Sequence, residues 1–392
     1  MHHIHQKWVR SSSQESSQHH HNDGMNSHFF ISICQICNRS TMMIVGRETE
    51  STVEMSTVDE TSSDGNSLQE EVMDKLTIYR DDDIRLEEMS LWGNFSTTAI
   101  YKLNRVETLT HEAKDENAPR NALMLKRLRG DLHARSAHAA MKDLRSEVAL
   151  LTKTLPEHPN VLRLRGVSWH FEESTEGFAV VEGVSETLAQ SLRLWKTESL
   201  AARKGFFSSL RKASHLSAVD QAIRIENIAL GLASAMQFLR SHRVVYRVLQ
   251  PDCIGLRRNG RQPVLINFTH ARVLSRNKSL QDQVGSKHYW AKEVAQNKAY
   301  GHSADIYQFG LLLWELLTFE RPYESAMSEN ELNEWLAYPG KHPNLKRVFS
   351  DRIKSLLKNS WTDDPTKRPS WATIKAWLRA EVDITRKAAE RT

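Results

Sequence analysis

The segment Val244–Cys253, with the sequence VVYRVLQPDC, places a cation, a carboxylate and a thiol close together along the chain. Val248 stands at its centre and can neither accept a proton nor hold a charge. Cys253 is a soft ligand, so it suits a hard cation such as Mg²⁺ poorly. Asp252 lies four residues beyond Val248, and its side chain is expected to point elsewhere. The segment therefore combines residues that could take part in chemistry with an inert side chain at its centre.

Length and composition predict a folded protein. The chain has 392 residues, enough for two domain-sized units or one large bilobal unit, and 40% of them are hydrophobic, enough to fill a core. The net charge is only +5, and basic residues are scattered in short clusters between acidic ones. Neither nucleic-acid nor membrane-surface binding is therefore predicted. No apolar run reaches the ~18 residues that a membrane span needs.

Cysteine usage indicates a reducing compartment, and a cytoplasmic location is expected. The chain has three cysteines, two of them in the motif CQIC (Cys34 and Cys37), which is no disulfide framework. No second cysteine pair follows at zinc-finger spacing, and no βαβ pattern frames the motif. No metal site is therefore predicted here.

Three regions follow one another along the chain. Residues 1–83 are rich in Ser, His, Thr, Asp and Glu, and are expected to be disordered because they bury too little apolar surface to offset the entropy of ordering. Residues 84–183 alternate like short strands around one helix. Residues 184–392 show mainly helical spacing, with a Ser-rich insert near 204–217. The pattern predicts an α+β fold with a small β-rich lobe and a larger helical lobe.

Eight short motifs in a fixed order make this plan resemble the protein kinase fold. The resemblance covers roughly residues 84–380 and is closest to the Ser/Thr and tyrosine-kinase-like domains found in microalgae. One short match would be weak evidence, but several in the right order are specific. The motifs, in order, are ALMLKRL, LRSEVALL, HPNVLRLRGVS, VVYRVLQPDCIGL, VLINFTHAR, VGSKHYWAKEVA, SADIYQFGLLLWELLTFERPY and WTDDPTKRPSWATI.

The resemblance implies a nucleotide pocket. Lys126 takes the place of the lysine that holds the nucleotide phosphates, and Glu147 that of the helix glutamate that pairs with it. Val181 stands at the gatekeeper position, beside the hinge residue Glu182. Gly93, in LWGNFST, corresponds to the second glycine of the loop that covers the phosphates. Lys126 and Glu147 form either a nucleotide clamp or only a structural ion pair, so ATP binding stays open.

The resemblance also implies structural roles for several charged residues. Glu293 and Arg368 correspond to a buried pair that serves the helical lobe, and Asp305 to a buried aspartate of the same lobe. Arg247 corresponds to an arginine that contacts a phosphorylated activation segment. That segment covers residues 269–293 here and contains three serines: Ser275, Ser279 and Ser286.

Positions that carry the chemistry in this family hold other residues here. Val248 replaces the aspartate that accepts the substrate hydroxyl proton, and Gln250 replaces the lysine of the same loop. Cys253 stands where an asparagine holds a second magnesium ion. Asn267 and Thr269 replace the aspartate and glycine of the Asp-Phe-Gly motif, so the main magnesium ligand has lost its charge.

The combined losses favour a pseudokinase. Leu91 and Ser96 also replace two glycines of the phosphate-covering loop, and bulkier residues restrict that backbone. A positioned general base is worth about 10²–10⁴ in rate. Exchanging a carboxylate for an amide beside a divalent ion removes one full charge. At an effective dielectric near 20, unit charges ~4 Å apart interact by about 4 kcal/mol, which indicates the size of that loss. Phosphoryl transfer depends almost wholly on positioning and electrostatics, so magnesium binding is not expected.

Three functions remain open from the residues. The first is a pseudokinase that acts as a signalling scaffold or allosteric partner of other proteins, such as an active kinase or its substrate, with or without nucleotide. The second is a weakly active ATP-dependent Ser/Thr protein kinase. The third is an interaction scaffold that binds no ligand. Val248 and Asn267 favour the first over the second, and contact of Lys126 and Gly93 with a nucleotide separates the first from the third.

Overall fold

The computed structural model describes residues 33–34, 39–40, 76–80, 84, 89–103, 123–204, 218–257 and 260–391. The chain divides into two units, residues 1–61 and 62–392. In the first unit, β1 (Ile33–Cys34) pairs antiparallel with β2 (Arg39–Ser40). The predictions for Cys37, for most of the tail 1–83 and for the Ser-rich insert beyond residue 204 lie outside the described residues.

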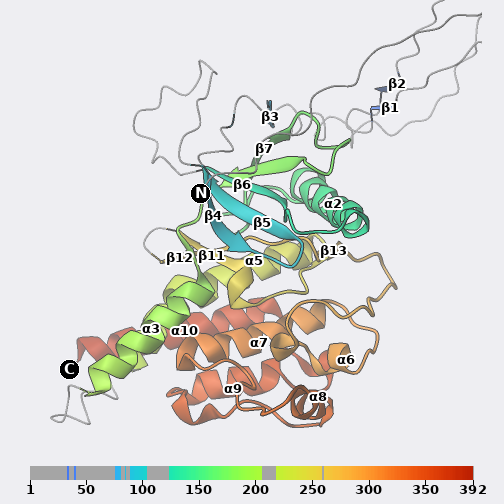
Figure 1. Ribbon diagram of the computed structural model, residues 1–392. Helices are drawn as coiled ribbons and strands as arrows, with labels where there is room; N and C mark the ends of the chain where they lie inside the picture. Colours follow the sequence, from blue (N-terminus) through green and yellow to red (C-terminus); the bar gives the residue numbers. More distant parts are fainter. Residues whose placement is uncertain are drawn as a thin grey trace, which may run out of the picture. The chain divides into compact units, whose positions relative to one another are not determined.

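Among the described residues of the second unit, a six-stranded sheet and the helix α2 (Ala134–Ala149) form the small lobe (Figure 1). The strand order is β3-β7-β8-β6-β5-β4, in which β3 runs parallel to β7 and the other neighbours are antiparallel. β3 lies before residue 84, the predicted start of the lobe. It was not predicted from the sequence, because so short a strand shows no alternating pattern. The strands are β3 (Thr77–Tyr79), β4 (Met89–Asn94), β5 (Thr98–Leu103), β6 (Leu123–Leu128), β7 (Leu164–Ser168) and β8 (Phe178–Glu182).

The two faces of this sheet carry separate apolar layers because side chains alternate along each strand. On one face, Ala140, Met141 and Leu144 of α2 pack with Val167 and Ala179. The helix then continues into the π-helical turn η3 (Leu150–Thr154). This packing fixes α2 against the sheet. The second apolar layer consists of Tyr79, Ile84, Leu103, Leu125, Phe178 and Val180.

The larger lobe is mainly helical and is built around α7 (His302–Thr318). All residues of α7 from Ala304 to Thr318 are buried, as expected for a helix without a polar face. Helices α8, α9 and α10 each begin after a serine whose hydroxyl accepts a backbone N–H of the first turn. The other helices are α3 (Leu188–Lys204), α5 (Leu230–Ser241) after the π-helical turn η4 (Ile225–Ala229), α6 (Lys292–Ala295), α8 (Glu329–Ala337), α9 (Asp351–Ser360) and α10 (Trp371–Glu390).

Strands of two small sheets border the two loops that carry the altered motifs, residues 246–253 and 266–271. One has the order β12-β11-β9 and the other pairs β10 with β13. The strands are β9 (Glu186–Thr187), β10 (Val244–Val245), β11 (Ile254–Arg257), β12 (Gln262–Leu265) and β13 (Arg272–Val273). Single 3₁₀ turns are η5 (Pro251–Cys253), η6 (Lys287–Tyr289), η7 (Leu345–Arg347) and η8 (Pro365–Lys367).

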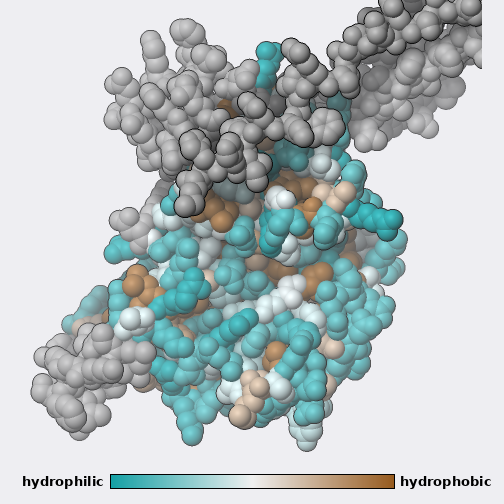
Figure 2. All heavy atoms as spheres, viewed as in Figure 1, coloured by the Kyte–Doolittle hydropathy of each residue, from teal (hydrophilic) through white to brown (hydrophobic). Residues whose placement is uncertain are grey.

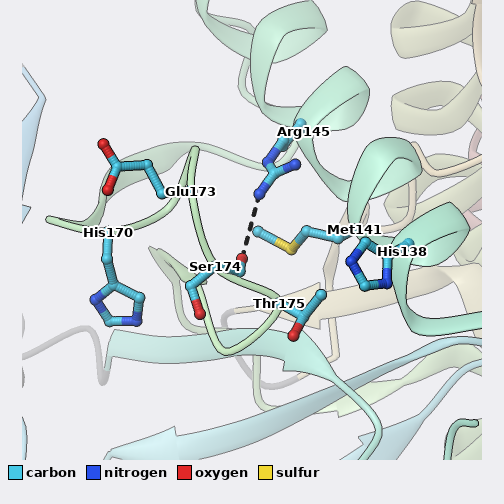
Figure 3. A pocket seen from close by; sticks show the side chains of 7 residues that line it. All are labelled: His138, Met141, Arg145, His170, Glu173, Ser174 and Thr175. Carbon is cyan, nitrogen blue, oxygen red and sulfur yellow. Dashed lines mark hydrogen bonds between the residues drawn. The ribbon is translucent and has the colours of Figure 1, made fainter. Parts of the chain in front are cut away.

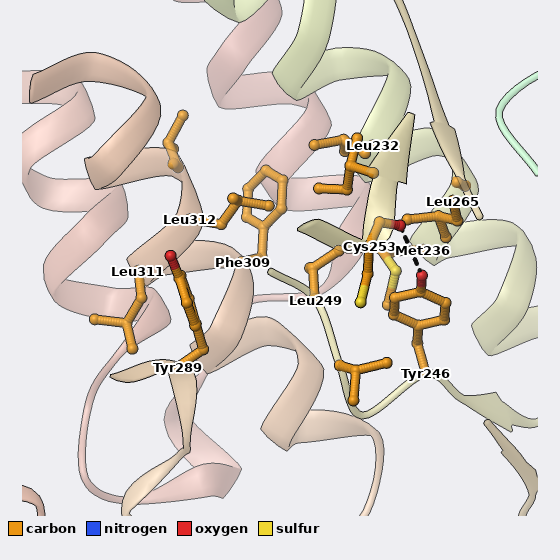
Figure 4. Close-up of a cluster of buried hydrophobic side chains, with 14 of the residues drawn as sticks. Leu232, Met236, Tyr246, Leu249, Cys253, Leu265, Tyr289, Phe309, Leu311 and Leu312 are labelled. Carbon is orange, nitrogen blue, oxygen red and sulfur yellow. Dashed lines mark hydrogen bonds between the residues drawn. The ribbon is translucent and has the colours of Figure 1, made fainter. Parts of the chain in front are cut away.

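This architecture confirms the predicted α+β, two-lobed fold. Tyr246, Leu249 and Cys253, from the loop after β10, point into the core of the helical lobe beside Met236 and Phe309 (Figure 4). Figure 2 shows mostly hydrophilic residues on the visible face of this lobe, with apolar residues in small groups. In the described part of the chain, no helix is both long enough and apolar enough to cross a membrane.

Candidate active site

A buried ion pair joins the sheet of the small lobe to α2. Lys126 lies on β6 and Glu147 in the last turn of α2, with Nζ of the lysine 2.6 Å from Oε1 and 2.7 Å from Oε2 of the glutamate. Their side chains are 1% and 2% exposed. Each charge therefore depends on the other, because a buried charge without a partner is strongly destabilising. The structure thus brings together the two residues that the motifs pair.

The pair continues into the residues that follow β12. Oδ1 of Asn267 accepts a hydrogen bond from Lys126 Nζ at 3.3 Å. Thr269 Oγ1 lies 2.7 Å from Asn267 Oδ1 and 2.9 Å from Glu147 Oε2, so its one proton is shared between the two oxygens. The backbone N–H of Phe268 also donates to Glu147, at 3.2 Å. These four side chains and the backbone form one closed, buried network.

The network does not fit a magnesium ion. Oδ1 of Asn267 already faces the ammonium of Lys126, the hydroxyl of Thr269 and, at 3.4 Å, the backbone N–H of Thr269. A divalent cation needs free oxygens and would meet donors here. Cys253 lies beside the amide, with Sγ 3.7 Å from Nδ2, and burial raises the pKa of its thiol to about 12. Nowhere in the described ranges do three or more His, Cys, Asp or Glu gather to hold a metal ion.

The N–H donors of Lys126 all have acceptors within the protein. An ammonium has three N–H donors, and three acceptor oxygens surround this one, two from Glu147 and one from Asn267. The ring of Phe95, from the turn after β4, lies over Nζ with its centroid 5.6 Å away. A nucleotide phosphate would have to displace one of the internal acceptors.

Gly93 lies on β4, where the pairing with β5 shifts register between Leu91 and Gly93. A Cβ on Gly93 would meet nothing within 4 Å, so no close approach requires glycine there. Trp92 donates from Nε1 to the backbone carbonyl of Ser185 at 3.3 Å, and it packs with Phe95 against the main core. Neither aromatic residue was predicted from the sequence, although both lie within two residues of Gly93 in LWGNFST.

Val181 and Glu182 end β8, beside β6. Val181 is 2% exposed and pairs with Met124. The carboxylate of Glu182 lies 3.1 Å from Arg257, at the end of β11, and 3.9 Å from Arg165. Glu182 is therefore engaged in ion pairs that fasten the hinge to the small sheet of the helical lobe.

Val248 is buried beneath residues of the activation segment. It is 3% exposed, and a Cβ on Gly285 would lie only 3.0 Å from its Cγ1. Gln250 holds the same contact, since its Oε1 accepts the backbone N–H of Ser286 at 3.0 Å. A substrate hydroxyl approaching this point would meet backbone and an isopropyl group. Asp252, in contrast, is exposed on η5.

The charged residues with predicted structural roles are all buried and paired. Arg368 binds Glu293 through two parallel contacts, of 2.6 and 2.8 Å. Asp305 accepts the backbone N–H groups of Tyr246 at 2.9 Å and Arg247 at 2.8 Å. Burial raises the pKa of Asp305 to about 6, while the two amides favour its charged form. The scaffold that positions the loop around Val248 is therefore intact.

A separate pocket of about 350 Å³ lies between α2 and the loop that joins β7 to β8 (Figure 3). Arg145 crosses it from α2 and donates to the backbone carbonyls of Phe171 at 3.1 Å and Ser174 at 3.2 Å. His138, also on α2, lines the pocket. Since 100° separates successive helical residues, His138 points to the opposite side of the helix from Glu147. The pocket shares no lining residue with the buried network.

Comparison with known families agrees with this geometry. The model of the protein kinase domain matches residues 116–378, which is more than half of the chain. The chain therefore belongs to the protein kinase family, as the ordered motifs predicted. Domains of this family in general use ATP and magnesium.

Curated relatives are protein kinases from several organisms. A probable LIM domain-containing serine/threonine-protein kinase of Dictyostelium discoideum is 27% identical over 232 residues, 58% of this chain and 31% of that protein. Serine/threonine-protein kinase STY46 of Arabidopsis thaliana is 28% identical over 147 residues, 38% of this chain and 25% of that protein. Serine/threonine/tyrosine-protein kinase HT1 of the same plant is 24% identical over 259 residues, 66% and 60% of the two chains. The chain spans a third or less of the length of the first two.

Proposed function

We propose that this chain is a pseudokinase: a kinase-fold domain that transfers phosphate poorly and acts as a signalling scaffold or allosteric partner of an active kinase or its substrate. The observation that carries the proposal is the contact between Lys126 Nζ and Asn267 Oδ1, at 3.3 Å. The amide of Asn267 has no charge to attract magnesium, and its oxygen already accepts a hydrogen bond from Lys126. Lys126, at the phosphate-binding position, and Asn267, at the magnesium-binding position, are thus hydrogen-bonded to each other.

The surroundings of Val248 support the same proposal. A positioned general base contributes about 10²–10⁴ in rate, and an isopropyl group contributes none of it. Gly285 lies close to Val248, since a Cβ on it would be 3.0 Å from Val248 Cγ1, which leaves little room there for a reacting hydroxyl. Asp252 is exposed on η5 while Val248 is buried, which does not favour Asp252 as a substitute base.

We propose further that magnesium ATP binds weakly. The third donor of Lys126 is directed at Asn267, so this contact must open before a triphosphate takes that donor, while the pair with Glu147 stays in place. The apparent affinity then falls in proportion to the fraction of open molecules.

A weakly active ATP-dependent Ser/Thr protein kinase is the second candidate. The observation in its favour is the formed pair of Lys126 and Glu147, at 2.6 Å, because active kinases need this pair in place. Any residual rate would come from positioning alone.

The proposal includes a small lobe that ends at residue 183 and begins with β3, ahead of the predicted residue 84, a helical lobe over residues 184–392, and a cytoplasmic location. Three cysteines in 392 residues offer no disulfide framework, which suits a reducing compartment. Scattered basic clusters and a net charge of +5 favour protein partners over nucleic acid.

A phosphorylation assay tests the proposal. The purified full chain, radiolabelled ATP and a general protein substrate are compared with Lys126→Arg, which keeps a cation beside Glu147, and with the double variant Val248→Asp/Asn267→Asp. We expect the wild type to incorporate no more label than Lys126→Arg. Incorporation by the wild type above that of Lys126→Arg, at a rate that matches an active double variant, contradicts the proposal.

A thermal-shift titration separates the candidates. ATP is added with and without MgCl₂ to the wild-type chain, and the melting temperature is followed. We expect magnesium to add nothing to the effect of ATP on the melting temperature, because Asn267 offers the metal no charge and its oxygen already accepts hydrogen bonds. A melting temperature that rises only when both are present supports the weakly active kinase instead.

A further inference from the structure

Arg247 is a buried cation in a restricted conformation. Its side chain is 1% exposed, and its φ of +75° is unfavourable for a residue other than glycine. Nε donates to Tyr300 Oη at 2.9 Å, and Nη1 donates to the carbonyl of His270 at 3.1 Å. A guanidinium keeps its charge in proteins. Burial of this one therefore requires a counter-charge.

Asp282 supplies that counter-charge from the activation segment. Its Oδ2 lies 2.5 Å from Nη2 of Arg247, and its backbone carbonyl accepts from the same nitrogen at 3.2 Å. Tyr300 Oη donates to that carbonyl at 2.7 Å. Burial opposes ionisation of Asp282, but the contacts with Arg247 prevail and lower the pKa of its carboxyl overall. Arg247, Tyr300 and Asp282 thus form a charged contact in which Arg247 is buried and the side chain of Asp282 is 61% exposed.

A second carboxylate near Arg247, that of Asp305, makes different contacts. Asp305 belongs to α7 and accepts the backbone N–H groups of Tyr246 and Arg247. It therefore holds the loop before Val248 and does not reach the activation segment. The charged attachment of the segment to Arg247 comes from Asp282.

Apart from Asp282, the segment is attached by the ion pairs of Arg272 with Asp143, Lys287 with Glu329 and Glu293 with Arg368, and by neutral hydrogen bonds. Leu280 pairs with Tyr300 through backbone bonds of 2.8 and 2.9 Å, and Gln283 Nε2 donates to the carbonyl of Val294 at 2.9 Å. Ser275 and Ser279 are exposed. The charge-assisted contact at Asp282 is of the stronger kind, because hydrogen bonds to ionised groups exceed neutral ones.

We infer that Arg247 and Tyr300 form an anion site that Asp282 fills from within, so that the activation segment is ordered without phosphorylation of its serines. Phosphate on such a segment orders it in many kinases by pairing with arginine. Here the carboxylate of Asp282 already forms an ion pair with Arg247. Removing that carboxylate leaves a site suited to a small dianion such as inorganic phosphate, whose oxygens match a guanidinium.

The inference is independent of the proposed loss of catalysis. It concerns the order of residues 274–286, whereas the proposed function concerns proton transfer at Val248 and metal binding at Asn267. A chain that proved to be an active kinase would leave it standing, and a failure of the inference would leave the pseudokinase proposal standing.

Hydrogen–deuterium exchange tests the inference on the full chain, shown by mass spectrometry to be unphosphorylated. Exchange over residues 274–286 is compared among the wild type, Asp282→Ala, Asp282→Glu and Ser279→Ala. We expect protection in the wild type and in Ser279→Ala, partial protection in Asp282→Glu, and exchange faster by on the order of ten-fold in Asp282→Ala. Inorganic phosphate should restore protection and raise the melting temperature of Asp282→Ala while leaving the wild type unchanged.

Three results overturn the inference. One is rapid exchange of the segment in the unphosphorylated wild type. Another is protection in Asp282→Ala equal to that of the wild type. The third is a loss of protection that phosphate does not reverse, which removes the anion site. If Asp282→Ala fails to fold, Asp282→Asn keeps the shape and loses the charge, and full protection in that variant overturns the inference equally.

Discussion

Nζ of Lys126 and Oδ1 of Asn267 lie 3.3 Å apart, so the residue at the usual phosphate-binding position donates to the residue at the usual magnesium-binding position. In catalytic kinases the two residues hold different parts of a magnesium nucleotide. Here they hold each other, and Thr269 links Asn267 to Glu147 at 2.9 Å. A neutral amide permits this arrangement, because a second carboxylate in the same buried site would repel Glu147.

Asn267→Asp is expected to lower the stability of the metal-free protein and to create a response to magnesium. The new carboxylate would share Lys126 and Thr269 with the buried carboxylate of Glu147, and a bound cation would relieve the repulsion. Thermal-shift curves with and without MgCl₂ measure both effects. Asn267→Leu is the control, since it loses the hydrogen bonds without gaining a charge, and it should not respond to magnesium. Equal responses in the wild type and Asn267→Asp would contradict this expectation.

Lys126→Met is expected to reduce the free energy of unfolding by about 3–5 kcal/mol, because it leaves the charge of Glu147 buried without its partner. The double variant Lys126→Met/Glu147→Leu removes both charges and should regain most of that loss. Equilibrium unfolding in urea measures the three proteins. If the double variant is no more stable than Lys126→Met, the unpaired charge is not the cause of the loss.

Gly285→Ala is expected to lower the free energy of unfolding by about 1–2 kcal/mol, because its φ of +77° strains residues that carry a Cβ. The new Cβ would also lie 3.0 Å from Val248 Cγ1. Gly93→Ala is the matched control, since a Cβ there meets nothing within 4 Å and its effect should stay within about 0.5 kcal/mol. Urea unfolding of both variants makes the comparison, and equal effects would argue against close packing at Val248.

Glu315 predicts a pH dependence of stability. It lies on α7, is 9% exposed and accepts a hydrogen bond from Tyr289 Oη. Burial raises the pKa of Glu315 to about 7 from 4.5. The hydrogen bond from Tyr289 and the charge of Arg321 oppose the rise, and Asp252 and Glu324 add to it. A raised pKa in the folded state means that the contribution of this group is fully present below about pH 4.5 and is lost as the pH rises through about 7.

Glu315→Gln tests this sign, because the amide keeps an acceptor for Tyr289 without a titrating group. Relative to the wild type, the variant should gain up to about 3 kcal/mol in the free energy of unfolding between pH ~4.5 and pH ~7.5. Urea unfolding at several pH values measures the difference. A difference that stays constant with pH would show that Glu315 does not titrate in this range.

Local patterns were sufficient for the fold and for the pairs that accompany it. Ala140 and Leu144 recur at helical spacing and mark the face of α2 that packs on the sheet. The ordered motifs likewise indicated Arg368 and Glu293, which lie 2.6 Å apart. Trp92 and Phe95 were missed, since nothing in their spacing tells whether an aromatic side chain turns toward solvent or toward the core.

By itself, the sequence determined which atoms stand at the site: an isopropyl group at Val248 and an amide at Asn267, in place of two carboxylates. Only the tertiary structure decided what those atoms touch. Lys126 and Asn267 are 141 residues apart in sequence, and Arg247 and Asp282 are 35 apart. Such contacts arise where the sheet, α2 and the activation segment pack together, and no local spacing specifies which buried donor will meet which acceptor.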